Sequence, residues 1–407
     1  MVKLLGHLSK HVELILQYFR KMNVLEFGNY IPAALLGKHL ENIGFCVTKI
    51  ERPISSRGRS EEIEYMKHMK HDIDKDKVHV SLDLPTEKNK LEELIKTTDI
   101  IIENFAPHVA LKRGFDFETC KRINPNVIYI SLPGFMPSDT LYKNTVAWDG
   151  NIMASSGVFC DMGLNRKLLG IKASYSSLTL PSSYGSSFSL FVLMCAIRSK
   201  RYGEHFVVPL ASSLMEALVH NSLSFPLDTC YMNMRKRTIL KEQYPISEEE
   251  LDQLQDPFFR KYVCLDNRPF YLVCPAHIRH QKQALKVLGI ETQVLNIMSP
   301  VDVYSEKFNY GLGCGNVHEM HAKQIYPLMK EAFYKKTSSE WEYLFGIHGV
   351  PAIAHKTKQE WIECSHATDS GLVVEKNNSI HLGPIGWLHC SHNIYFSIFF
   401  SQVKRIY

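Results

Sequence analysis

Serine side chains gather at the start of one apolar segment, in a position where a helix start and chemistry can coincide. The segment reads L-T-L-P-S-S-Y-G-S-S-F-S-L-F-V-L-M-C, from Leu178 to Cys195. The hydroxyl of Ser182 or Ser183 is suited to accept a hydrogen bond from an unpaired backbone N–H of the first helical turn. A helix start also gathers unpaired N–H donors and partial positive charge, which stabilise an anion. The segment therefore fits either a capped core helix or an anion site.

Three other short motifs match reactive sites only in part. The glycine-rich stretch G-L-G-C-G follows no predicted strand and lacks the Lys-Ser/Thr pair of a phosphate loop. His318 and His321 are spaced for one helix face, but H-E-M-H differs from the H-E-x-x-H of zinc proteases. The serines do not form G-x-S-x-G after a strand. We therefore expect no metal site and no hydrolase nucleophile elbow.

The elements that must position such residues alternate between strands and helices in the first half of the chain. Alternation of this kind predicts a parallel sheet covered by helices on both faces, with a ligand crevice at the carboxyl ends of the strands. The first strand–helix turn, F-G-N-Y-I-P-A, lacks G-x-G-x-x-G, so a dinucleotide bound as in a dehydrogenase is not expected. The predicted strands are 24–27, 46–52, 78–84, 99–105 and 127–135, with helices at 32–42 and 87–96.

The pattern changes beyond residue 224, where a second domain is predicted. The segment K-Y-V-C-L-D-N-R-P-F-Y-L-V-C reads as two strands joined at Asp266-Asn267. We therefore predict an α/β protein with a Rossmann-like large domain and a smaller α+β domain. The predicted bounds are an N-terminal extension at 1–22, the large domain at 23–225, the small domain at 226–360 and a C-terminal return segment at 361–407.

Composition is that of an ordinary globular protein. The chain has 407 residues, of which 45% are hydrophobic and 22% charged, with a net charge of +5. This mild positive charge favours an acidic small ligand but lacks the dense basic stripes of a nucleic-acid-binding protein. No stretch reads as a membrane-spanning helix. We therefore expect neither a nucleic acid nor a membrane as a partner.

Cysteine usage and the N-terminus bear on localisation. The ten cysteines are scattered and contain no C-x-x-C pair, which favours a reducing compartment and a cytoplasmic protein. The first 22 residues are basic with one acid, Glu13, and their apolar residues fit one helix face. This pattern fits a surface helix, or a mitochondrial transit peptide that is poor in arginine and serine.

Several longer stretches resemble class III CoA-transferases, the CaiB/BaiF family that also contains formyl-CoA transferase and alpha-methylacyl-CoA racemase. The most specific are E-N-F-A-P and, further along, R-I-N-P-N-V-I-Y-I-S-L-P-G-F. Others are V-L-E-F, G-F-C-V-T-K-I-E-R-P, S-L-D-L-P-T, L-M-E-A-L, S-S-E-W and V-P-A-I-A-H, all in the family's order. The resemblance implies a Rossmann-like domain, two interlocked chains in a homodimer, and acyl-CoA and carboxylate substrates.

Carried over by position, the resemblance implies a set of residues near the CoA. Basic side chains are suited to the phosphates, and apolar Leu82 and Phe105 are suited to hold the flat adenine between them. Lys112 stands where many relatives carry arginine, which replaces a two-pronged donor by a point charge. The implied set is Tyr30, Pro32, Arg52, Leu82, Asn104, Phe105, Lys112 and Arg113.

The resemblance also identifies a departure at the start of the serine-rich segment. Relatives carry an aspartate there, which takes the acyl group as a mixed anhydride in transferases or moves a proton in racemases. This chain has Pro181 at that position, and no Asp or Glu lies between Arg166 and Glu204. Proline supplies neither a nucleophile nor an acid–base group, and Ser182 is a poor acyl carrier without an activating base.

Three readings of function follow from these residues. The first is CoA transfer between carboxylic acids, with Ser182, Asp149 and Glu216 as the candidate catalytic groups. The second is a catalytically inactive CoA-binding or partner subunit, favoured by Pro181. The third is an acyl-CoA racemase, which is disfavoured because Trp148 stands where racemases carry histidine. The C-terminal ending also departs from the family, so we expect an atypical return segment that is truncated or aberrantly ended.

Overall fold

Two compact units make up the chain. One comprises residues 1–159, 175–220 and 366–407, and the other comprises residues 160–174 and 221–365. The computed structural model describes residues 22–28, 31–53, 70–142, 145, 147–156, 158–161, 176–214, 256–274, 278–298, 317, 319–369, 373–376, 379–382, 387–390 and 394–397.

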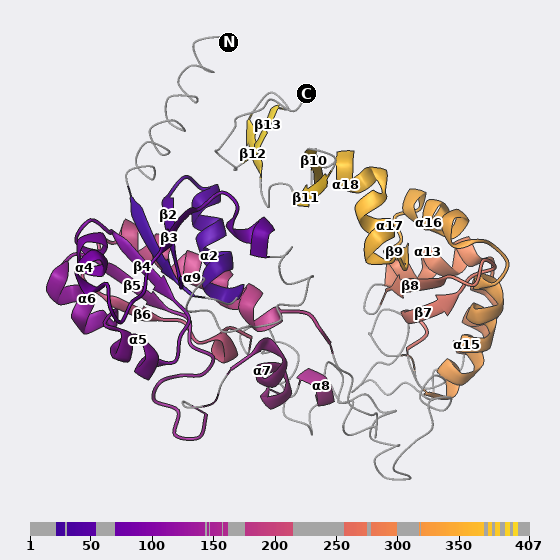
Figure 1. Ribbon diagram of the computed structural model, residues 1–407. Coiled ribbons are helices and arrows are strands. Elements are labelled where there is room, and N and C mark those ends of the chain that lie inside the picture. The colour runs from indigo at the N-terminus through magenta and orange to yellow at the C-terminus, as the bar shows by residue number, and fades with distance from the viewer. Residues whose placement is uncertain are drawn as a thin grey trace. The chain divides into compact units, whose positions relative to one another are not determined.

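The first unit is built on a six-stranded parallel sheet in the order β3-β2-β1-β4-β5-β6 (Figure 1). This order reverses direction between β1 and β4, which is where ligands bind in open α/β sheets. The sheet confirms the predicted Rossmann-like α/β fold. Its strands are β1 Asn23–Phe27, β2 Cys46–Glu51, β3 Val78–Ser81, β4 Ile100–Glu103, β5 Ile128–Ser131 and β6 His205–Val207.

Helices cover both faces of this sheet. Successive side chains of a strand point to opposite faces, and the apolar side chains on each face are buried against helices. On one face, Val24 and Ile102 pack with residues of α2 Ile31–Asn42, α7 Asp149–Ser155 and α9 Leu180–Arg198. On the other face, Leu25 and Ile101 pack with residues of α4 Lys88–Lys96, α5 Pro107–Arg113 and α6 Phe117–Ile123. The two faces are buried separately, so each strand reads as a nearly continuous apolar run.

The second unit holds a three-stranded antiparallel sheet, β7 Phe259–Val263, β8 Pro269–Val273 and β9 Ala352–Ala354. The predicted turn at Asp266-Asn267 joins β7 to β8, with Asn267 at a φ of 58°. Around the sheet lie α13 Ile278–Leu288, α14 Glu291–Met298, α15 Glu319–Phe333, α16 Ser338–Ile347 and α17 Lys358–Glu363. His321 is buried in α15, whereas His318 and the G-L-G-C-G stretch lie outside the described residues.

Short elements complete the described chain. They are α8 Val158–Asp161, α18 Ser365–Asp369 and the antiparallel pairs β10 Val373–Lys376 with β11 Ser379–Leu382 and β12 Trp387–Cys390 with β13 Ile394–Ser397. By length and composition alone, α9 is apolar enough to cross a membrane, which corrects the expectation that no stretch would be. However, Leu193, Ala196 and Ile197 of α9 belong to the core against the sheet. A core helix of this kind passes the same test.

Candidate functional site

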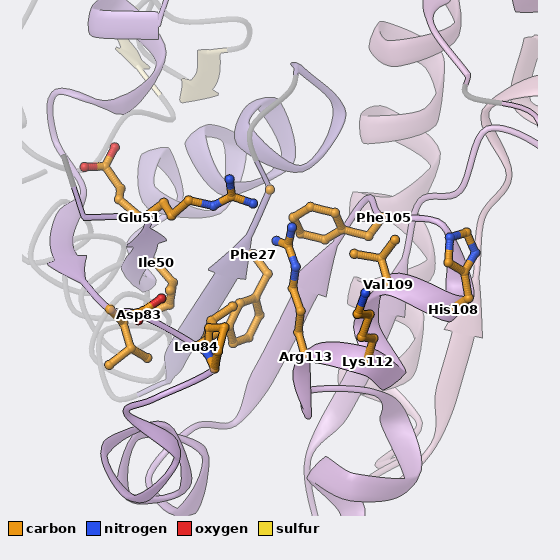
Figure 2. Close-up of a pocket in the computed structure, with 14 residues that line it drawn as sticks. Phe27, Ile50, Glu51, Asp83, Leu84, Phe105, His108, Val109, Lys112 and Arg113 are labelled. Atoms are coloured by element: carbon orange, nitrogen blue, oxygen red, sulfur yellow. The ribbon is translucent and has the colours of Figure 1, made fainter. Parts of the chain in front are cut away.

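A cavity of about 570 Å³ opens at the carboxyl ends of β1, β2, β3 and β4 (Figure 2). Parallel strands end at one edge of a sheet, so turns distant in the sequence meet there. Lining residues lie at or just after each of these strand ends: Phe27 and Gly28, Ile50 to Arg52, Leu82 to Pro85, and Phe105, with His108, Val109, Lys112 and Arg113 from α5. The cavity thus spans the point at which the strand order reverses.

Aromatic rings and cations share this cavity. Phe27 and Phe115 stack with ring centroids 4.3 Å apart, and Phe105 meets Phe115 edge to face at 5.7 Å. The Arg113 guanidinium lies 5.1 Å from the centre of the Phe105 ring (Figure 2). Burial, together with repulsion from nearby Arg52, lowers the pKa of Arg113. Two neighbouring cations that repel each other and partly lack water favour an anion between them.

Two glycines allow the backbone to shape the cavity. A Cβ on Gly28 would lie 2.9 Å from the Ala33 Cβ and would also clash with Asn104 Oδ1, so the turn after β1 has room only for glycine. Gly114, at a φ of 76°, ends α5 in the left-handed conformation directly after Lys112 and Arg113. These two cations therefore lie in the last turn of α5, where the helix dipole also favours positive charge.

The structure brings most of the predicted CoA residues together. Arg52, Leu82, Phe105, Lys112 and Arg113 all line the cavity. Leu82 is only 1% exposed, so little of its side chain is available for contact with a ligand. The half-buried Leu84 beside it presents more surface to the cavity.

The remaining predicted residues are not among those that line the cavity. Pro32 is buried in the first turn of α2. Asn104 directs its buried Oδ1, which has no hydrogen-bond partner, toward Gly28. Tyr30 lies outside the described residues.

Sequence reasoning missed the contribution of Phe27, Leu84, His108 and Val109 to the cavity. Phe27 and Leu84 follow from the strand ends, since each lies at or just past the end of β1 or β3. His108 and Val109 sit one helical turn before Lys112 and Arg113, so i, i+4 spacing on α5 would have found them.

A carboxylate meets the start of α9, although α9 supplies none itself. Asp149, the first residue of α7, accepts hydrogen bonds from the Ser182 backbone N–H and from the Ser182 hydroxyl, both at 2.7 Å. The expected cap from Ser182 or Ser183 is wrong: α9 begins at Leu180, its N-cap Thr179 makes no side-chain cap bond, and Asp149 fills that role. Pro181 is buried in the first turn. Glu216 lies outside the described residues.

Comparison with known proteins places this geometry in a family. The profile of CoA-transferase family III matches residues 20–390. The chain belongs to CoA-transferase family III. It is 33% identical over 391 residues to the CoA-transferase/lyase DddD of Marinomonas sp. (strain MWYL1), covering 90% of this chain and 46% of that protein. It is 22% identical to the cinnamoyl-CoA:phenyllactate CoA-transferase of Clostridium sporogenes, covering 86% and 81% of the two chains.

Solved structures agree with the family fold. A CAIB/BAIF family protein from Brucella suis superposes with a TM-score of 0.62 at 17% identity, covering 92% of this chain and 93% of its own. The protein Rv3272 from Mycobacterium tuberculosis superposes with a TM-score of 0.67 at 15% identity, covering 90% and 92%. The chain nevertheless spans less than half the length of DddD.

Beneath the cavity of this family III chain lies a buried acid, Glu103, at the end of β4. The Glu103 side chain accepts a hydrogen bond from the Phe105 backbone N–H at 2.6 Å and bonds the Ser131 hydroxyl. Burial raises the pKa of Glu103 from 4.5 to about 7, because these two hydrogen bonds only partly offset the loss of water.

Glu103 makes the stability of the fold depend on pH. The folded chain binds this proton more tightly than the unfolded chain, so the stabilisation is fully present below pH 4.5 and is lost as the pH rises through about 7. Glu103→Gln should remove this loss, which amounts to about 3 kcal/mol in the free energy of unfolding. Urea unfolding from about pH 4 to about pH 8 measures it, because this interval brackets both 4.5 and the raised pKa of about 7. The exposed Glu92→Gln on α4 is the control. Equal pH slopes for wild type and Glu103→Gln would contradict the assignment.

Proposed function

We propose that this chain binds CoA thioesters in the cavity at the strand ends and transfers CoA between carboxylic acids. The proposal rests on one observation: the same cavity is lined by Phe105, Arg52, Lys112 and Arg113. The aromatic and apolar walls suit adenine, and the cations suit phosphates. The relatives' names support the reaction class, since DddD is a CoA-transferase/lyase and the Clostridium enzyme a CoA-transferase.

Asp149 is the group we propose to carry the acyl group. The family resemblance implies a carboxylate at the start of α9, and Asp149 reaches that place from α7. Each carboxylate oxygen retains a lone pair beyond its bond to Ser182. Attack of one oxygen on the thioester carbonyl carbon would form a mixed anhydride and expel the CoA thiolate. Ser182 is less suited because it is only 1% exposed.

The alternative of an inactive subunit rested on Pro181 and the lack of a neighbouring acid in the sequence. Asp149 removes the reason for that alternative, because a carboxylate lies at the start of α9 after all. The racemase alternative still lacks its histidine, since Trp148 precedes Asp149 as the N-cap of α7. The interlocked homodimer, the cytoplasmic or mitochondrial localisation and the absence of nucleic-acid and membrane partners stay predictions.

CoA affinity tests the binding half of the proposal. Lys112→Ala should weaken CoA binding by about 1–2 kcal/mol, the scale of one charge-assisted hydrogen bond. Isothermal titration calorimetry measures the change. Lys96→Ala is the matched control, because Lys96 also lies in the last turn of a helix but does not line the cavity. The absence of any binding heat for wild type at millimolar CoA would reject the site.

A further inference from the structure

Glu103 lies directly under the residues that line the cavity. It is 3% exposed, and in the sheet register it faces Phe27 of β1 on one side and Ser131 of β5 on the other. Its Oε2 accepts the Phe105 backbone N–H at 2.6 Å. Glu103 therefore holds the turn that presents Phe105 to the cavity without itself lining the cavity.

A chain of hydrogen bonds connects Glu103 to the far edge of the sheet. The Ser131 hydroxyl bonds Glu103, and Ser131 Oγ lies 2.7 Å from His205 Nε2 on the exposed strand end of β6. Ser131 has one hydrogen to give, so it donates to the ionised Glu103 and accepts from His205 Nε2–H. A protonated Glu103 can instead donate to Ser131, which then donates to a His205 Nε2 that carries no hydrogen, so a proton has a path between solvent and Glu103. The serine bridges the two other groups and is buried, so this is not a hydrolytic triad.

The surroundings of Glu103 contain few groups that stabilise its negative charge. Tyr129 of β5 and Cys120 of α6 face Glu103. Burial is the largest cause that raises the pKa of both groups, and the negative charge of Glu103 raises it further. Asp116, the N-cap of α6, is a further acid on that side. Arg113 lies beyond the Phe105 ring, and within the described residues no cation offsets the burial of Glu103.

Binding of CoA in the cavity would favour the protonated form of Glu103. The phosphates of CoA bring further negative charge into the cavity above Glu103, and that charge disfavours a second negative charge on the Glu103 carboxylate beneath it. The adenine also excludes water above Phe105. Both changes disfavour a carboxylate. Because burial already brings the pKa of Glu103 to about 7, a modest further change alters its protonation at neutral pH.

We propose that Glu103 is a positioning residue of the nucleotide cavity that takes up a proton from solvent when CoA binds, so that CoA binding strengthens as the pH falls through neutrality. This inference rests on the CoA site proposed above. The proton ends on the Glu103 carboxylate, delivered along the Ser131–His205 path, and no other bond is made or broken.

Proton uptake can be measured directly. Calorimetric titrations with CoA near neutral pH, in buffers of different ionisation enthalpy, give the number of protons bound per CoA. Wild type should take up roughly 0.3–0.5 more protons than Glu103→Gln, since a half-ionised acid can gain at most about half a proton. The glutamine still accepts from Phe105 but does not titrate. Protons exchanged by the CoA phosphates are common to both proteins and cancel.

Ser131→Ala gives a second readout should Glu103→Gln fail to fold. It removes a hydrogen bond that lowers the pKa of Glu103, so the pH at which proton uptake is greatest should move upward. An unchanged pH of maximal uptake, or equal proton counts in wild type and Glu103→Gln, would overturn the inference while leaving the CoA site intact. No binding heat in wild type would instead reject the CoA site itself.

Discussion

Asp149→Asn should lower the rate of acyl transfer by about three orders of magnitude or more, because an amide cannot form the mixed anhydride. Asparagine preserves the packing: its Oδ1 accepts the Ser182 backbone N–H and its Nδ2 donates to the Ser182 hydroxyl. Acyl-CoA donors incubated with carboxylate acceptors measure the rate. Mass spectrometry of trapped adducts should place the acyl group on the peptide that contains Asp149 in wild type alone.

Two further variants separate Asp149 from its neighbours at the start of α9. Ser182→Ala removes the bond to one carboxylate oxygen and keeps the backbone bond to the other, so transfer should fall by about tenfold or less. Full turnover in Asp149→Asn with an adduct on Ser182 would move the chemistry to the serine. An inactive wild type that gains activity in Pro181→Asp would restore the inactive-subunit reading, with the required carboxylate at Pro181.

Lys77→Met should destabilise the fold by about 3–5 kcal/mol, the usual cost of leaving a buried charge unpaired. Lys77 belongs to a buried ion ring formed by Glu26, Lys49, Asp74 and Lys77. Lys77 Nζ lies 2.7 Å from both Glu26 and Asp74, and Lys49 Nζ lies 3.1 Å from Glu26 and 2.5 Å from Asp74. All four residues are less than 9% exposed. Two cations and two anions thus balance, and removing one cation leaves a net buried negative charge.

The pKa values of the ring follow this balance. Burial alone would lower the pKa of Lys49, but attraction by Glu26 and Asp74 outweighs burial and raises it. Burial alone would raise the pKa of Asp74, but Lys77 and Lys49 lower it. Attraction within the ring therefore favours the charged forms of Lys49 and Asp74.

Urea unfolding with matched controls tests the ring. Lys75→Met is the control, because Lys75 pairs with Asp72 at the same 2.7 Å distance but at the surface, where such pairs contribute about 1 kcal/mol or less. Adding Glu26→Gln to Lys77→Met restores neutrality and should recover part of the loss. Similar destabilisation by Lys77→Met and Lys75→Met would show that burial does not govern the energy of the ring.

The order of the elements in the first unit could be predicted from the sequence, and a family resemblance pointed to residues that share one cavity. Alternating strands and helices predicted the parallel sheet, and the resemblance carried by E-N-F-A-P implied CoA-binding roles for Phe105, Lys112 and Arg113, which line one cavity. The prediction of the sheet is confirmed because it depends on local spacing, and one rule, that parallel strands present their carboxyl ends at the same edge, predicts where a ligand crevice lies. The same rule, applied to every strand end, would also have found Phe27 and Leu84.

The meeting of side chains that are distant in the sequence depends on the tertiary fold. Asp149 and Ser182 are 33 residues apart, Glu26 and Lys77 are 51 apart, and Ser131 and His205 are 74 apart. The sequence favoured an inactive subunit because α9 begins without a carboxylate. In the structure, Asp149 of α7 lies at the start of α9. Such pairings depend on strand order, register and the packing of helices on the sheet, because a hydrogen bond requires two atoms within about 3 Å whatever their separation in sequence.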